Sequence, residues 1–93
     1  MEKKIAFAIL KEIEKGNKAY DEESFGVTPE EFSDGFRYLI RNGLADNVLF
    51  ADDKAYWYTG ATVTKAGQDF LKENSAWNKA YKFAKEIREW INL

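Results

Sequence analysis

A helix-start signal near residue 28 constrains the fold of this chain more than any other feature. Thr28 can cap a helix, Pro29 suits the first helical position, and Glu31 stands three residues after the cap, where its carboxylate completes a capping box. The apolar stripe of this helix comprises Phe32, Phe36, Leu39 and Ile40. Because asparagine and glycine follow the stripe, we predict a helix over residues 29–42.

Two strand-like segments and a further helix follow. Residues 44–51 and 55–63 are rich in β-branched and aromatic side chains, so they predict a hairpin over 44–63. A threonine cap then starts a helix over 65–73, in which Gly67 indicates close packing against the strands. This order of capped helix, hairpin and second capped helix is that of a winged helix, with the hairpin as its wing.

Helices at both ends complete the predicted domain. Isoleucine recurs every four residues from Ile5 to Ile13, which predicts an amphipathic helix over 3–15. Apolar residues also follow one side of a predicted C-terminal helix, 76–91. A chain of 93 residues has room for one core. We therefore predict the α+β class: one winged helix-turn-helix domain over 1–93, with a three-helix core, a β-hairpin wing and an additional C-terminal helix.

Composition argues against several classes of protein. The chain has no cysteine and no histidine, so it lacks thiol chemistry, the usual general base near neutral pH and the commonest nitrogen ligand of metals. No apolar run approaches the roughly 20 residues that a membrane span needs. We therefore predict a cytoplasmic protein that is not an enzyme, with no cofactor, no metal site, no small-molecule substrate and no membrane contact.

The helix 29–42 occupies the position that reads DNA in a winged helix. Arg37, Tyr38 and Arg41 are its candidate nucleic-acid contacts, since arginine can bind guanine or phosphate. Its leading turn is acidic, however, with Glu30 at its start, and the wing tip, Asp52-Asp53-Lys54, is net negative. Association with DNA is driven by cations that neutralise phosphates, so these charges disfavour DNA as a partner.

A basic surface on the C-terminal helix leaves the DNA alternative open. Lys79, Lys82 and Lys85 follow one another along this helix at intervals of three residues. If a dimer aligned two such surfaces, their combined charge could compensate for the acidic recognition helix.

The predicted C-terminal helix is also the candidate surface for self-association. Its apolar arc of about 180° is wider than the roughly 100° that packing on one core requires. If Ala80, Ala84 and Ile87 face the domain, Phe83 and Trp90 lie on the outer edge of this helix. Trp77, Phe83 and Trp90 are therefore the candidate contacts of a symmetric homodimer. The alternative is that both edges of the helix cover the wing and Phe7 of the same chain.

Several short stretches carry a family resemblance that runs from the first helix to Trp90. They are Ala8-Ile9-Leu10-Lys11-Glu12-Ile13, Gly26-Val27-Thr28, Thr64-Lys65-Ala66-Gly67, Leu71-Lys72-Glu73-Asn74, Lys79-Ala80-Tyr81-Lys82 and Lys85-Glu86-Ile87. In these stretches the sequence resembles the YjcQ-like family of small proteins from bacterial chromosomes, prophages and phages. The resemblance implies a winged-helix domain and a phage or prophage context, and it supplies no active-site residues.

Two functional interpretations follow. We favour a non-catalytic winged-helix interaction module of phage or prophage origin that acts by protein–protein contact and self-association. The alternative is a DNA-binding winged-helix transcriptional regulator that uses the helix 29–42. The charge of that helix and of the wing favours the first, because charges specific to this chain outweigh an analogy of architecture.

Overall fold

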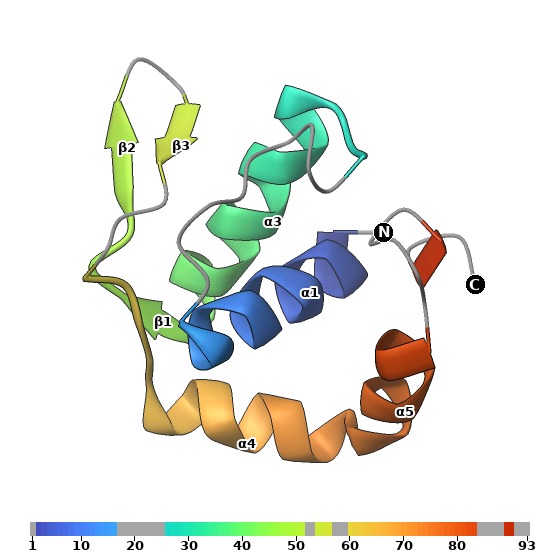
Figure 1. Ribbon diagram of the computed structural model, residues 1–93. Coiled ribbons are helices and arrows are strands. Elements are labelled where there is room, and N and C mark those ends of the chain that lie inside the picture. Colours follow the sequence, from blue (N-terminus) through green and yellow to red (C-terminus); the bar gives the residue numbers. More distant parts are fainter. Residues whose placement is uncertain (1, 17–25, 52–53, 57–59, 84–88, 91–93) are drawn as a thin grey trace.

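The computed structural model is an α+β fold in which helices surround one central helix (Figure 1). It describes the backbone of residues 2–16, 26–51, 54–56, 60–83 and 89–90, and the side chains of these residues except 49–51, 54–56 and 82–83. Along the described chain the elements are α1 (Glu2–Lys15), α3 (Pro29–Arg41), β1 (Ala45–Asp46), β2 (Leu49–Ala51), β3 (Lys54–Tyr56), β4 (Thr62–Val63), α4 (Lys65–Glu73) and α5 (Ser75–Phe83).

Helix α1 forms the centre of the core. It lies between α3 on one side and α4 on the other (Figure 1). Every residue from Ile5 to Leu10 is at most 1% exposed, so this part of the helix is buried all round. The isoleucine stripe predicts only one buried face. Phe7, which lies off that stripe, is buried because α4, α5 and the C-terminal segment cover the second face.

Helix α3 begins with the predicted capping box. The backbone N–H of Glu31 donates to Thr28 Oγ1 over 3.0 Å, and the N–H of Thr28 donates to Glu31 Oε1 over 2.9 Å. Gly35 brings α3 close to α1, since a β-carbon there would lie 2.7 Å from Cγ2 of Ile5. Ile40, which the sequence assigns to the apolar stripe, is 42% exposed because it lies at the edge of the buried face.

The two strand segments pair as two short antiparallel ladders. β1 pairs with β4, and β2 pairs with β3 next to the turn. Two residues separate β1 from β2, whereas five separate β3 from β4, so the ladder cannot continue in one register. Asn47 takes a positive φ of 64° at this break, and its Nδ2 donates to the carbonyl oxygen of Gly60 over 3.2 Å. Residues 52 and 53 of the predicted wing tip lie outside the described chain.

Helix α4 is held tightly against the segment that follows α3. Thr64 caps it by accepting a hydrogen bond from the N–H of Gly67 over 3.0 Å, and its hydroxyl donates to the carbonyl oxygen of Gly43 over 2.6 Å. A β-carbon at Gly67 would collide with the carbonyl oxygen of Leu44 and lie 2.7 Å from Cγ1 of Val63. The predicted close packing at Gly67 is therefore present, and it sets the distance between α4 and the end of α3.

An aromatic cluster joins the C-terminal segment to α1. Around the ring of Phe7 lie the rings of Trp77, Tyr81 and Trp90, with centroid distances of 5.5, 6.1 and 5.5 Å. Phe70 of α4 completes the cluster at 6.2 Å. Aromatic rings from α4, from α5 and from Trp90 thus cover one phenylalanine of the central helix.

The predicted C-terminal helix over 76–91 is described only in part, because α5 spans Ser75–Phe83 and residues 84–88 lie outside the described chain. A straight helix would separate positions 77 and 90 by about 20 Å along its axis. The ring centroids of Trp77 and Trp90 are 5.6 Å apart, and each lies 5.5 Å from the centroid of the Phe7 ring. Trp77 and Trp90 are therefore too close to lie 13 positions apart on one straight helix, and both indoles pack on Phe7.

Candidate functional site

The three candidate DNA contacts lie on one side of α3, close to its C-terminal end. Arg37 and Arg41 are exposed, and Tyr38 between them is half-buried. The structure therefore brings the three residues to one helix surface, as their spacing predicts. Their surroundings differ, and these surroundings decide what the surface can bind.

Each of the two arginines has a carboxylate beside it. Arg37 Nη1 lies 3.1 Å from Oδ1 of Asp34, one turn back on the same helix. Arg41 Nη2 lies 3.0 Å from Oε1 of Glu2, at the start of α1. Both pairs are largely exposed, so they add little to stability. Each pair nevertheless places a carboxylate next to the guanidinium that would have to contact a DNA phosphate.

The acidic start of α3 has a structural explanation. Glu31 is used in the capping box, and Glu30 is exposed beside it in the first turn. Carboxylates near a helix N-terminus interact favourably with the helix dipole, by about 0.3 to 1 kcal/mol. These acids therefore stabilise the helix start, and they also leave a negative charge at the end that would meet a DNA groove.

Tyr38 faces a hollow between the end of α3 and α4. The hollow has a volume of about 390 Å³, and Tyr38 and Phe70 are aromatic residues in its wall. Their ring centroids are 6.1 Å apart, and the guanidinium carbon of Arg41 lies 5.9 Å from the centroid of the Tyr38 ring. We call this feature the α3–α4 hollow. Sequence patterns do not reveal it, because its walls come from α1, α3 and α4.

Polar groups around the α3–α4 hollow are mostly hydrogen-bond acceptors. Asp69 and Glu73 stand one turn apart on α4 and contribute two carboxylates. Asn42 and Asn74, the C-cap residues of α3 and α4, also line it. Lys3 of α1 also lines the hollow, and its Nζ lies 5.5 Å from the centroid of the Trp77 ring.

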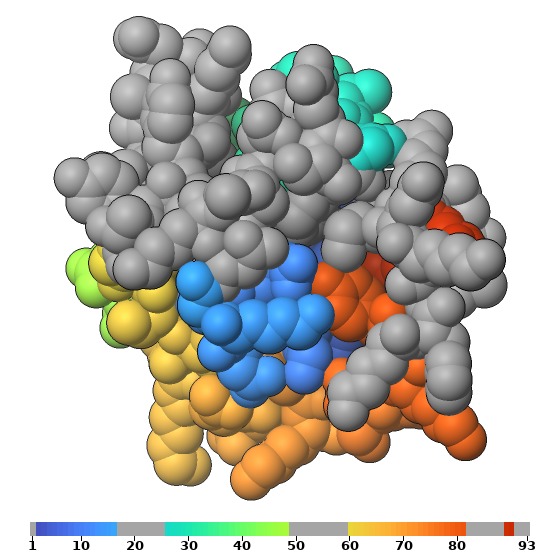
Figure 2. Space-filling model, viewed as in Figure 1, coloured from blue at the N-terminus to red at the C-terminus, as the bar shows by residue number. Residues whose placement is uncertain are grey.

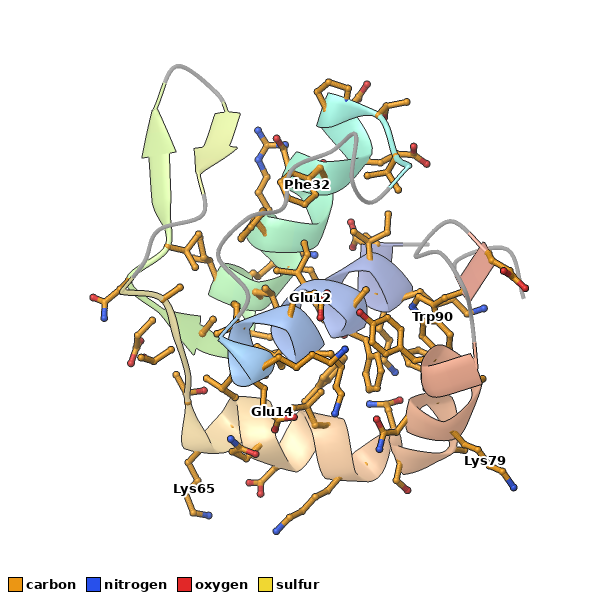
Figure 3. The ribbon with its side chains drawn as sticks, in the orientation of Figure 1. Glu12, Glu14, Phe32, Lys65, Lys79 and Trp90 are labelled. Atoms are coloured by element: carbon orange, nitrogen blue, oxygen red, sulfur yellow. The ribbon has the colours of Figure 1, made fainter. Side chains whose placement is uncertain are left out.

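The candidate self-association residues belong largely to the core. Trp90 is 1% exposed, so the prediction that it lies on an outer edge is wrong; its indole points back to α1 (Figure 3). Trp77 is half-buried and meets the Phe7 ring edge-on, at an interplanar angle of 88°. The side chain of Phe83 lies outside the described part of the chain. These contacts agree with the alternative in which the C-terminal segment covers Phe7 of its own domain.

The basic residues of the C-terminal segment are only partly described. Lys79 is exposed on α5 and points away from the domain, as Lys65 does on α4 (Figure 3). The side chains of Lys82 and Lys85 lie outside the described chain. The light-blue end of α1 reaches the surface between α4 and α5 (Figure 2), where Lys11 and Glu14 form an ion pair of 3.0 Å.

One tyrosine has a strongly altered acidity. Tyr81 is 6% exposed, and this burial raises its pKa. The negative charge of Glu12, and the hydrogen bond between the two side chains, raise the pKa further. Lys15 lies 3.3 Å from the Glu12 carboxylate and 5.3 Å from the centroid of the Tyr81 ring. This group packs on the core, and none of its three residues lines the α3–α4 hollow.

Within the described ranges, no group of three or more acidic, histidine or cysteine side chains is arranged to hold a metal ion. In the same ranges no helix has both the length and the apolar character that crossing a bilayer requires.

Comparison with known proteins identifies the family. Residues 7–90 match the family model described as YjcQ protein. The chain belongs to the YjcQ family. It is 44% identical over 89 residues to the uncharacterized protein YjcQ of Bacillus subtilis (strain 168), and the alignment covers 95% of each chain. It also resembles the solution NMR structure of the YjcQ protein from Bacillus subtilis, with a TM-score of 0.69 and 39% identity over 78% of this chain and 95% of that chain. The family resemblance seen in the sequence is confirmed.

Proposed function

We propose that this YjcQ-family chain is a non-catalytic winged-helix interaction module that acts through protein–protein contact rather than by reading DNA. The observation that carries the proposal is the pairing of both recognition-position arginines with carboxylates, Arg37 with Asp34 and Arg41 with Glu2. A duplex would have to displace these carboxylates before it gained the two cations.

The winged-helix interpretation draws support from the order of the elements. Helix α3 is followed by the antiparallel segments β1 to β4 and then by α4, and β3 runs beside α3. In this interpretation α3 is the recognition-position helix and the β2–β3 hairpin is the wing.

Electrostatics argue against a phosphate partner for α3. Cations that neutralise phosphates release counterions, and this release drives most non-specific binding to DNA. The leading turn of α3, which would enter the groove, presents the exposed carboxylate of Glu30. A protein surface with donors and cations is the better complement to such a face.

Self-association and the phage or prophage context remain part of the proposal. With Trp90 inside the core and Trp77 packed on Phe7, a homodimer through the C-terminal segment would depend on Phe83 and on the exposed side of α5. The alternative function, a DNA-binding regulator, would use Arg37, Tyr38 and Arg41.

A gel retardation assay with random-sequence duplex at low salt tests the proposal. We expect no retardation by the unmodified chain, and we expect retardation once Glu30→Lys and Asp34→Lys reverse the charge of the α3 face. Retardation by the unmodified chain that falls steeply with salt would instead support the regulator, provided that Arg37→Ala with Arg41→Ala abolishes it. Lys65→Ala with Lys72→Ala is the matched control, because it removes the same charge from α4.

A further inference from the structure

We propose that the α3–α4 hollow binds a cationic side chain of the partner protein, above all the guanidinium of an arginine. This inference rests on the proposed function, because it gives the interaction module a site and its partner a chemistry. It depends on the shape of the hollow, on its aromatic wall and on the sign of the charge around it.

The aromatic wall suits a planar cation. Tyr38 and Phe70 lie side by side there, with ring centroids 6.1 Å apart and planes inclined by 55°. An arginine guanidinium can stack on such rings, and the attraction is worth about 0.5 to 1 kcal/mol at an exposed site. A volume of about 390 Å³ leaves room for one long side chain.

Charge at the hollow is negative from two sources. Asp69 and Glu73 supply two carboxylates, and the one ion pair described for Asp69, to Lys65, is loose at 3.9 Å with the lysine side chain 93% exposed. The carboxyl ends of α3 and α4 both border the hollow, because Asn42 and Asn74 are their C-caps. A helix carries partial negative charge at this end, which favours a cation nearby.

Hydrogen-bond capacity points to the same ligand. The side-chain N–H groups of Asn42 and Asn74 donate to the carbonyl oxygens of Tyr38 and Phe70, over 2.9 and 2.8 Å. Each amide therefore has its oxygen left as an acceptor, beside the two carboxylates. Among the described residues that line the hollow, Lys3 is the sole cation. A guanidinium, which has five N–H donors and no acceptor, complements such a wall.

The test is a titration of the isotope-labelled 93-residue chain with the capped tripeptide Gly-Arg-Gly, monitored by the NMR shifts of its backbone amides. We expect saturable shifts for Tyr38, Asn42 and the end of α4. The same peptide with lysine in place of arginine should bind more weakly. The citrulline peptide, which keeps the shape of arginine and loses its charge, should give no saturable shift.

Two pairs of variants locate the binding. Asp69→Asn with Glu73→Gln should weaken arginine-peptide binding about fivefold, the effect of losing two exposed ion pairs. Glu14→Gln with Asp46→Asn removes the same charge from exposed positions outside the hollow and should leave binding unchanged. Lys3→Gln should strengthen binding, because it removes a like charge from the wall.

Three results would overturn the inference. They are the absence of any saturable shift with the arginine peptide, equal weakening by the two double variants, and weaker binding after Lys3→Gln. The last would indicate an anionic ligand, and inorganic phosphate would then produce the shifts at the hollow. None of these results bears on the gel retardation assay, so the inference can fail while the proposed protein-contact function stands.

Discussion

The indole Nε1 of Trp90 donates a hydrogen bond to the backbone carbonyl oxygen of Lys4 over 3.3 Å, across a sequence separation of 86 residues. The indole is 1% exposed and packs against Phe7, and Nζ of Lys4 lies 5.2 Å from the centroid of its ring. A buried indole usually needs a partner for its one N–H group, and Lys4 supplies it. The end of the described chain is thereby attached to the first turn of the central helix.

Trp90 is expected to stabilise the fold rather than to contact a second molecule. Trp90→Ala should lower the free energy of unfolding by about 3 to 5 kcal/mol, because it leaves a cavity beside Phe7. Trp90→Phe keeps a ring but loses the hydrogen bond, so it should cost less. Urea denaturation measures both changes, with Ile40→Ala at a 42% exposed site as a control expected to cost under about 1 kcal/mol. Similar unfolding midpoints for Trp90→Ala and the unmodified chain would contradict this role.

At Gly67 we expect substitution by alanine to lower the stability of the fold, although helix propensity alone predicts an increase. Alanine is favoured over glycine in a helix by about 1 kcal/mol. Gly67→Ala should nevertheless destabilise the fold by about 1 to 3 kcal/mol, because the added methyl group collides with the backbone carbonyl oxygen of Leu44. Gly60→Ala is the matched control, since no atom lies within 4 Å of a β-carbon there. Thermal unfolding of the two variants and of the unmodified chain tests this prediction. A melting temperature of Gly67→Ala above that of the unmodified chain would exclude the collision.

The locally encoded parts of the fold could be predicted from the sequence. The capping box of Thr28 and Glu31 and the cap at Thr64 are made by residues three apart, so their spacing alone indicates where α3 and α4 begin. The α+β class and the pairing of the two strand segments follow from similar short-range patterns. The spacing of Arg37 and Arg41 likewise indicates a shared helix surface.

The other features depend on contacts between distant segments. The wide apolar arc of the predicted C-terminal helix indicates that this side packs on another surface. The pattern is the same whether that surface is Phe7 of the same chain or a second molecule. The ion pair between Arg41 and Glu2 joins two helices, so no local pattern reveals that this arginine is neutralised. The α3–α4 hollow likewise needs three elements to be placed before it can be recognised.

Self-association through the C-terminal segment stays a prediction, and the burial of Trp90 changes how it has to be tested. Trp90→Glu would place a charge in the core and unfold the monomer, so it cannot report on an interface. Phe83→Glu is the sharper variant. Sedimentation equilibrium at tens of micromolar should show a dimer for the unmodified chain and a monomer for Phe83→Glu, with circular dichroism confirming that the variant is folded. A monomeric mass for the unmodified chain at every concentration would exclude this dimer.

The raised pKa of Tyr81 predicts that the free energy of unfolding falls in alkaline solution. Burial, and then the charge and hydrogen bond of Glu12, raise the pKa of Tyr81 in the folded chain above the ordinary tyrosine value of about 10. Below that value tyrosine is neutral in both states, and its stabilising contribution is complete. As the pH rises above about 10, the unfolded chain loses the proton first, so the free energy of unfolding falls.

Tyr81→Phe separates this effect from general alkaline denaturation. The variant should lose about 1 kcal/mol of stability at neutral pH, because the hydrogen bond to Glu12 is gone. Its stability should then decline less steeply above pH 10 than that of the unmodified chain, because phenylalanine has no proton to lose. Urea midpoints of both proteins across an alkaline series measure the difference. Parallel declines would show that the folded chain does not hold the Tyr81 proton more tightly than the unfolded chain.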